Sequence, residues 1–153
     1  MKENTALVRK CLKSEIGKCV AIGRSNHPEH FFLHEIESLE KYLRENLSAK
    51  HPYYVVEVEN HIVGCGGLWR KNKEIMRFCW GMIHPDWQGQ GLGTKLVQHR
   101  IEWGKNQAGL MVIELETSQK TVEFYKRFGF EVTRFTKDGI GPGLDKYDMQ
   151  NDI

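Results

Sequence analysis

The feature that most constrains the fold of this chain is a strand, loop, helix and strand pattern that begins near its middle. An apolar segment at 75–83 is followed by the loop 84–91, an amphipathic segment at 92–105 and a short apolar segment at 110–115. A short apolar run after a helix is typical of a buried strand, which returns parallel to the first strand through a right-handed crossover. The pattern therefore predicts one β–α–β unit with two parallel strands.

Segments on either side of this unit predict antiparallel strands. Their β-branched and aromatic residues favour strands at 53–59, 62–69, 130–135 and 144–149. Asn60-His61 can turn the first pair into a hairpin, and the glycine-rich segment 137–143 separates the second pair. Together these elements predict an α/β (α+β) fold with a mixed, mainly antiparallel central sheet, in a single domain that spans residues 1–153.

The remaining segments predict a first strand and further helices. We expect a strand at 5–8, a helix through Cys19 and Val20 that Gly23 breaks, a helix at 35–47, and a helix from Thr117 or Ser118 to Phe128. Within the strand at 62–69, Gly64, Gly66 and Gly67 indicate a bulge or a close approach of another backbone.

Composition excludes several classes of protein. Apolar residues form 40% of the 153 residues and charged residues 27%, which is typical of a soluble globular domain. The formal charge of +2 comes from interleaved basic and acidic residues, so we expect no nucleic-acid partner and no membrane partner.

The termini and the cysteines indicate the compartment. The start, Met1–Ala6, lacks a signal-peptide profile, and no apolar run approaches the roughly 20 residues of a membrane span. The four cysteines, Cys11, Cys19, Cys65 and Cys79, lack metal-ligand spacing. We therefore expect free thiols, no metal site and a cytoplasmic protein.

The loop and first helical turn after the first parallel strand suit a pyrophosphate group. Gly89, Gly91 and Gly93 let the backbone approach an anion, and the unpaired amides and dipole of a helix N-terminus favour negative charge. A dinucleotide site of the Rossmann type is the alternative, supported by Glu114 or Glu116 at the end of the next strand. The spacing disfavours this alternative, because Gly91 and Gly93 are only two residues apart and the first glycine does not follow its strand directly.

Two motifs resemble the signatures of the GNAT superfamily of N-acetyltransferases. Gln88-x-x-Gly91-x-Gly93 resembles the family's Q/R-x-x-G-x-G/A motif, and it follows a strand and His84-Pro85, as in many members. Thr117-Ser118-Gln119, followed by Phe124-Tyr125-x-x-x-Gly129-Phe130, resembles the second motif on the coenzyme A side. The resemblance covers residues 75–130 and fits the hairpin upstream, whereas the first fifty residues match only loosely.

The resemblance implies an enzyme that moves an acetyl group from acetyl-coenzyme A (acetyl-CoA) to a primary amine of a small molecule or a peptide. Backbone groups of Met82 and Ile83 would pair with the pantetheine arm like an added strand, and Tyr125 would protonate the departing thiolate. Many relatives have an Asn near the position of Ser118, so we expect its cofactor contact to be weaker or absent. The pyrophosphate would be held by amides of Gln88, Gly89, Gln90, Gly91, Leu92, Gly93 and Thr94. Dimers are common among members of the family, so the resemblance also implies that the protein could form a homodimer.

The neutral amine is the nucleophile, so the reaction needs a base or a site that favours the neutral form. An alkyl amine with a pKa near 10 is only about one part in a thousand neutral at pH 7. The candidate bases are Glu57, Glu114, Glu116 and His84. A Glu in a strand is more often solvated, and His84 can simply shape the turn before Pro85. Where some relatives carry a catalytic Glu this chain has Arg77, which favours a water relay, and no single base is assigned.

Several of these features also have structural explanations. Tyr125 falls with Val122 and Phe128 on an aromatic helical face that could be core. The loop 139–143 resembles a substrate-side loop of relatives, but it is equally a plain turn, and the Phe31-Phe32 region is expected to wall the acceptor pocket. The missing Glu leaves a different class of function open, a non-catalytic module that binds acetyl-CoA or coenzyme A as a sensor.

Overall fold

The computed structural model describes residues 5–153. Residues 1–4, on which the expectation about a signal peptide partly depends, lie outside the described residues. In chain order the elements, with η for a 3-10 helix, are β1 (Leu7–Lys10), η2 (Lys13–Glu15), α1 (Ile16–Ser25), α2 (Leu33–Asn46), β2 (Tyr53–Val58), β3 (His61–Arg70), β4 (Ile75–Ile83), η3 (Pro85–Trp87), α3 (Leu92–Lys105), β5 (Val112–Thr117), α4 (Val122–Lys126), β6 (Glu131–Gly141) and β7 (Leu144–Asp152).

The strands form a seven-stranded sheet in the order β1-β2-β3-β4-β5-β7-β6. β4 and β5 run parallel, whereas the pairs β1–β2, β2–β3, β5–β7 and β6–β7 are antiparallel. The mixed, mainly antiparallel sheet with one parallel crossover is confirmed, and it differs from the parallel sheet of a Rossmann-type fold. Two compact units share the chain: unit 1 is the part up to Leu68 with Cys79–Arg100, and unit 2 is Trp69–Phe78 with Ile101–Ile153.

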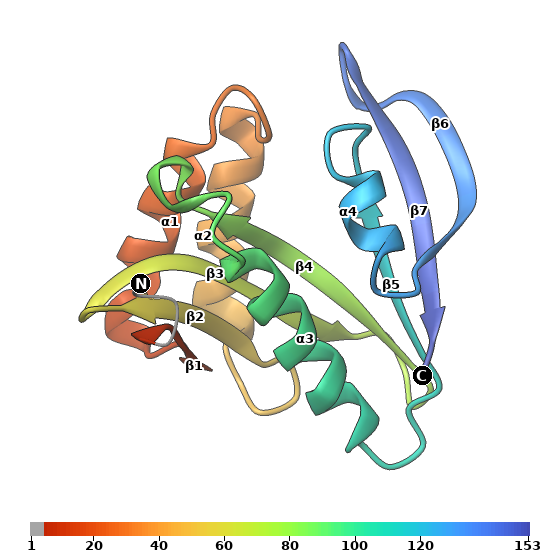
Figure 1. The fold of residues 1–153 in the computed structure, drawn as a ribbon, viewed down its shortest axis with the longest axis horizontal. Coiled ribbons are helices and arrows are strands. Elements are labelled where there is room, and N and C mark those ends of the chain that lie inside the picture. The colour runs from red at the N-terminus through yellow and green to blue at the C-terminus, as the bar shows by residue number, and fades with distance from the viewer. Residues whose placement is uncertain (1–4) are drawn as a thin grey trace. The chain divides into compact units, whose positions relative to one another are not determined.

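In unit 1, α1 and α2 cover one face of β2 and β3, and the first turns of α3 cover the other face (Figure 1). The side chains of β2 alternate between these two layers. Tyr53 and Val55 pack in a core with α1 and α2. The ring of Tyr54 instead lies 4.7 Å from the ring of His99 on α3. Because both faces of β2 are covered, this strand forms the centre of unit 1.

The core of unit 1 follows the helical spacing of its apolar residues. Ile36, Leu39 and Leu43 of α2 are at most 4% exposed, so one face of this helix is buried. Cys11 and Cys19 join the same core, with Sγ atoms 3.8 Å apart. All four cysteines are free thiols, as the sequence predicts.

The glycines of β3 mark a close approach of other groups, as predicted. A Cβ atom on Gly67 would lie 2.4 Å from the ring of Tyr53, and one on Gly66 would lie 3.2 Å from Nη1 of Arg100. Arg100 is only 1% exposed, and its Nη1 donates a hydrogen bond of 3.2 Å to the Gly67 carbonyl. The small residues therefore make room for a buried guanidinium beneath the strand.

In unit 2, β7 lies between β5 and β6 and pairs antiparallel with both. The first residues of β4 pair in parallel with β5, and Arg77 is the last of them, opposite Glu114. Burial alternates along β5, so that Ile113 and Leu115 lie in the core and Glu116 is exposed. This alternation directs the acidic side chains of β5 to the uncovered face of the strand.

Two helix predictions are wrong. α1 continues past Gly23 to Ser25, because this glycine faces Leu39 and an added Cβ atom would already lie 3.4 Å from its side chain. α4 is limited to Val122–Lys126 and does not begin at Thr117, which ends β5. Between the end of β5 and the start of α4, the Ser118 hydroxyl accepts a hydrogen bond of 3.2 Å from the Lys120 amide, and this bond forms a turn in place of a first helical turn.

Two strand predictions also need correction. β1 begins two residues later than expected, because its pairing with β2 runs from Leu7 to Lys10. β6 extends to Gly141 through most of the segment that the glycines predict as a loop. The register with β7 is irregular between Thr136 and Gly141, where the Asp138 amide donates to a carboxylate oxygen of Asp145 at 2.9 Å, and the turn itself is limited to Pro142-Gly143.

Among residues 5–153, no helix combines the length and the apolar character that crossing a bilayer requires.

Candidate active site

The loop between β4 and α3 presents glycines whose conformation and surroundings suit a bound anion. Gly89 and Gly91 have φ values of 78° and 80°, a region that glycine adopts without strain. A Cβ atom on either residue would meet no protein atom within 4 Å. Packing against the protein therefore does not explain these two glycines, and their backbone is open to a ligand.

The same loop leads into the N-terminus of α3, which has 14 residues. Lys95 donates its amide to the Gly91 carbonyl at 3.1 Å and closes the first helical turn. The amides of Leu92, Gly93 and Thr94 precede this bond, so they lie outside the helical ladder and at the positive end of the helix dipole. These three amides suit the predicted pyrophosphate site, whereas the Gln88 amide already donates to the Pro85 carbonyl at 3.4 Å.

The end of β4 determines which backbone groups can pair with an added strand. The His84 amide donates to the Val63 carbonyl of β3 at 2.8 Å. Backbone groups of successive residues point to alternate edges of a strand, so those of Ile83 point away from β3 and those of Met82 point towards it. Met82 is also 6% exposed and packs in the core of unit 1. This geometry favours the Ile83 amide over the backbone of Met82 for the predicted pairing with pantetheine, since the Ile83 carbonyl already accepts from Asn26 and Gln88.

Asn26, which directly follows α1, also contacts this region. Its Nδ2 donates to the Ile83 carbonyl at 3.2 Å, and its Oδ1 accepts from Nε2 of Gln88 at 3.2 Å. Gln88 also donates to the Ile83 carbonyl, at 2.9 Å. No motif in the sequence indicates this contact, because Asn26 and Gln88 are 62 positions apart.

β4 has an irregular residue just before its end. Trp80 has a φ of 40°, which is uncommon for a residue other than glycine. Its carbonyl accepts a hydrogen bond of 2.9 Å from the Tyr53 hydroxyl. Burial raises the pKa of this hydroxyl, so it stays protonated and remains a donor. The buried tyrosine thereby holds the backbone of β4 in its unusual conformation.

His84 shapes the turn that follows β4. Its ring Nδ1 accepts the Asp86 amide at 3.1 Å, and Pro85 begins the short helix η3. This contact supports the structural explanation of His84 and leaves its Nε2 as the only ring nitrogen that could exchange protons with a ligand.

In unit 2, the second motif lies at the end of β5 and on α4. The Ser118 side chain accepts the Lys120 amide, so the predicted cofactor contact would have to come from its hydroxyl proton or its backbone. The ring of Tyr125 packs at right angles to the rings of Phe124 and Phe130, with centroids 5.1 and 5.9 Å away. Its hydroxyl forms no hydrogen bond with any of the described residues, so this group is free to interact with a ligand.

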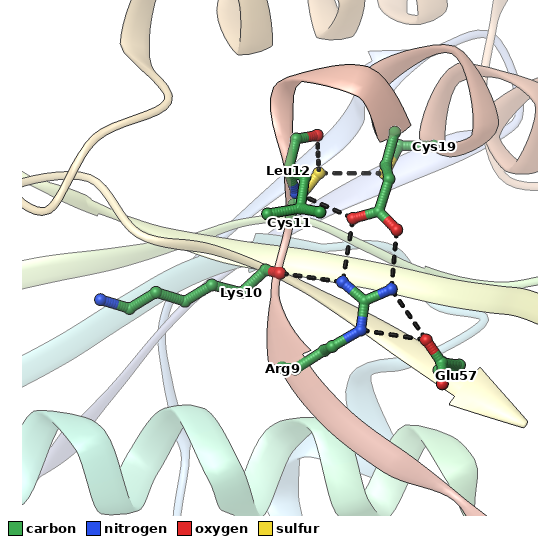
Figure 2. A network of polar contacts seen from close by, with 7 residues as sticks. Arg9, Lys10, Cys11, Leu12, Cys19 and Glu57 are labelled. Atoms are coloured by element: carbon green, nitrogen blue, oxygen red, sulfur yellow. Dashed lines mark hydrogen bonds and ion pairs between the residues drawn. The ribbon is translucent and has the colours of Figure 1, made fainter. Parts of the chain in front are cut away.

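The candidate carboxylate bases all lie in ion pairs. In unit 2, Arg77 binds both Glu114 and Glu116 at 3.2 Å, and Lys71 binds Glu114 at 3.3 Å. In unit 1, Glu57 binds the guanidinium of Arg9 at 2.8 Å (Figure 2). None of these carboxylates is free of an ion pair, so the geometry identifies none of them as the base.

Comparison with known proteins agrees with both motifs. The model of an acetyltransferase (GNAT) domain matches residues 49–132. A peptidyl-lysine N-acetyltransferase of Salmonella typhimurium is 30% identical over 138 residues, which are 88% of this chain and 90% of that protein. An uncharacterised N-acetyltransferase of Methanocaldococcus jannaschii is 33% identical over 94 residues, 56% of this chain. The match spans only 41% of that longer protein.

A solved structure supports the fold independently. The ribosomal-protein-S18-alanine N-acetyltransferase of Escherichia coli superposes with a TM-score of 0.79 at 17% identity. The superposition covers 97% of this chain and 94% of that protein. At this identity the likeness concerns the fold alone, and the family assignment rests on the sequence matches. The chain belongs to the GNAT family of acetyltransferases.

Proposed function

We propose that the protein transfers an acetyl group from acetyl-CoA to a primary amine of a small molecule or a peptide, by direct attack of the amine on the thioester. The observation that carries this proposal is the segment from Gln88 to Thr94. It has the spacing of the family motif, two glycines at positive φ with open surroundings, and the N-terminus of a 14-residue helix. These are the properties that a diphosphate group requires.

Each predicted residue has a role in this proposal. Amides from Gln88 to Thr94 bind the pyrophosphate, and the amide of Ile83, rather than the backbone of Met82, pairs with the pantetheine arm. The Tyr125 hydroxyl protonates the thiolate as it leaves, and Ser118 adds a weaker contact. We also propose that units 1 and 2 act as one acetyl-CoA-binding domain, which a single unfolding transition on heating would support.

Direct attack is preferred to an acetyl-cysteine intermediate because the cysteines are poor nucleophiles. A reactive cysteine needs a lowered pKa and access to solvent. Burial raises the pKa of the Cys79 thiol to about 11. The pKa of Cys11 is raised by its hydrogen bond with Cys19 and by burial. The hydrogen bond with Cys11 lowers the pKa of Cys19, but the hydrogen bond with Cys65 and burial outweigh it, so this pKa is also raised. These thiols stay protonated at neutral pH and cannot accept the acetyl group efficiently.

Deprotonation of the amine is then assigned to water or to the substrate itself. The carboxylates of Glu57, Glu114 and Glu116 are engaged by arginines, so a water that leads to solvent is the simplest acceptor of the proton. The rate with saturating acetyl-CoA should therefore rise with pH up to the pKa of the bound amine. The same lack of a free base is the observation that favours the second candidate, a sensor that binds the cofactor without turnover.

The relatives suggest which amines to test. The proteins of Salmonella typhimurium and Escherichia coli are described by their action on peptidyl-lysine and on the alanine of ribosomal protein S18. A lysine side chain and an N-terminal alanine both present a primary amine. A panel should therefore contain lysine peptides, peptides with a free N-terminus and small diamines.

The proposal is tested by thermal unfolding with acetyl-CoA, followed by release of free thiol with each amine. We expect a rise of several degrees in Tm and thiol release with at least one class of amine. Tyr125→Phe should lower kcat by about 100-fold with little change in the KM for acetyl-CoA, because it removes only the proton donor. Tyr147→Phe, on β7 of the same unit, is the matched control and should keep full activity.

The outcomes separate the two candidates. A rise in Tm without thiol release from any amine would favour the sensor. No change in Tm at any concentration of acetyl-CoA would refute both. Equal kcat values for Tyr125→Phe and the wild type would remove the acid role from Tyr125 but leave the reaction in place.

A further inference from the structure

We infer that Asn26 is a positioning residue that determines how tightly the loop after β4 binds the cofactor. The inference rests on the proposed function and concerns the same site. Asn26 follows the last residue of α1, far from both family motifs in the sequence, and is only 4% exposed. A buried polar side chain needs partners for all its hydrogen-bonding groups, and those of Asn26 come from three segments of unit 1.

The hydrogen bonds of Asn26 form a closed set. Its Nδ2 donates to the Ile22 carbonyl at 3.0 Å and to the Ile83 carbonyl at 3.2 Å. Its Oδ1 accepts from Nε2 of Gln88, which donates to the same Ile83 carbonyl at 2.9 Å. The orientation of the amide is determined by its surroundings, because the reverse orientation would place its oxygen against two carbonyl oxygens.

This arrangement fixes the two ends of the turn that precedes the glycines. Ile83 ends β4, Gln88 begins the family motif, and a single buried amide binds both. The Gln88 side chain is itself exposed, so without Asn26 it would keep one partner on the protein and lose the other to water. Binding of the pyrophosphate would then have to order the loop at that moment, and this ordering would weaken the affinity.

The same residue also fixes the connection between α1 and α2. The backbone carbonyl of Asn26 accepts the His30 amide at 2.9 Å. Asn26 therefore anchors the α1–α2 connection and the cofactor loop together. A structural role limited to the end of α1 would not require the bonds to Ile83 and Gln88.

The test compares neutral variants of similar size, so that no new charge lies near a pyrophosphate. Asn26→Leu and Gln88→Met each remove one side of the amide pair. Each should raise the dissociation constant of acetyl-CoA about tenfold, the effect of losing one or two hydrogen bonds. Because the two amides act as one unit, the double variant should weaken binding by about the same factor, not by the product of the two.

A matched control separates this role from general stability. Asn46 ends α2 and donates from Nδ2 to the Tyr42 carbonyl at 3.2 Å, four residues earlier, as Asn26 does to Ile22. Asn46→Leu should leave the affinity for acetyl-CoA unchanged. In turnover assays Asn26→Leu should raise the KM for acetyl-CoA about tenfold while kcat stays within about twofold of the wild type, because the chemical step is not changed.

Calorimetric titration of acetyl-CoA into each full-length variant decides the question. If the wild type binds and Asn26→Leu binds equally well, or if the two single effects multiply in the double variant, the inference is overturned and the proposed function remains. If the wild type does not bind acetyl-CoA, the proposed function fails and the inference fails with it. Should Asn26→Leu not fold, Asn26→Ala replaces it in the same cycle, because it removes the amide without adding apolar volume.

Discussion

Replacing Glu15 with glutamine tests whether the ion pairs around Arg9 stabilise unit 1. The carboxylate oxygens of Glu15 accept hydrogen bonds of 2.7 and 2.9 Å from the guanidinium of Arg9, and one of them also accepts the Leu12 amide at 2.9 Å. Arg9 donates on its other side to Glu57 (Figure 2). The hydrogen bonds from Arg9 are the main reason why the pKa of Glu15 lies at about 2, below its ordinary value of 4.5.

This lowered pKa corresponds to at most about 3.5 kcal/mol at neutral pH, because a tenfold change in acidity is worth about 1.4 kcal/mol. We expect Glu15→Gln to lower the free energy of unfolding by about 1.5 kcal/mol at pH 7. The value is smaller because glutamine keeps one acceptor oxygen, and because solvent screens the Arg9 side chain, which is 29% exposed.

The pH dependence gives a second criterion. A carboxyl group whose pKa is lowered by folding stabilises the protein above its unfolded value, near 4.5 for Glu15, and this stabilisation is lost as the pH falls towards about 2. The difference between the wild type and Glu15→Gln should therefore be constant above about pH 5.5 and should shrink by about 1 kcal/mol by pH 3.5.

Urea unfolding followed by circular dichroism, repeated at several pH values, measures both quantities. Glu40→Gln is the matched control, because Glu40 also pairs with an arginine, Arg44, at 2.9 Å, but with side chains 39% and 60% exposed. An exposed pair on a helix is worth about 0.5 kcal/mol or less. The reasoning is refuted if Glu15→Gln costs no more than Glu40→Gln at pH 7, or if its cost is the same at pH 7 and pH 3.5.

Three further substitutions test packing and order. Gly67→Ala should lower the free energy of unfolding by about 2 kcal/mol, because its Cβ atom would lie 2.4 Å from the Tyr53 ring. Gly17→Ala should instead raise the free energy of unfolding by about 0.5 kcal/mol, because its Cβ atom, on the first turn of α1, would meet no atom within 4 Å. Equal effects in urea unfolding would contradict this. Gln119→Ala should speed amide hydrogen exchange at the β6–β7 turn, because Gln119 donates to the Gly143 carbonyl at 2.7 Å, and unchanged exchange would show that this contact does not order the turn.

The elements that the sequence predicts best are those that local chemistry decides. The β–α–β unit, the hairpin at β2 and β3 and the helix α2 depend on apolar periodicity and on turn residues, which act within a few positions. The turn after β2 lies one residue earlier than predicted, at Glu59 and Asn60, whose φ values of 50° and 67° let two adjacent strands pair, and His61 already belongs to β3. The extent of β6 was not predictable in this way, because its glycines favour a loop and its pairing with β7 resumes only at Gly141, after an irregularity that follows Thr136.

The same difference between local and long-range contacts applies to the candidate site. The pyrophosphate loop is contiguous in sequence, so its motif predicts it. The contact of Asn26 with Gln88 and the bond from Tyr53 to Trp80 join residues 62 and 27 positions apart. Such contacts arise only when burial brings two segments together, and a single sequence has no local pattern that reports them. The sequence therefore predicted where a cofactor could bind and missed the side chains that hold this place in shape.

The glycines show why the structure is needed to distinguish residues required for packing from residues available for binding. In the sequence, Gly66 and Gly67 on β3 and Gly89 and Gly91 in the loop are equally conspicuous. The structure explains the first pair by packing, because each faces protein atoms 3.2 Å or less from where its Cβ atom would lie. The second pair faces no protein atom within 4 Å, yet has φ values of 78° and 80°. Glycine adopts these φ values without strain, so neither packing nor strain explains the second pair, and an open backbone just before a helix N-terminus agrees with the anion site proposed for the loop.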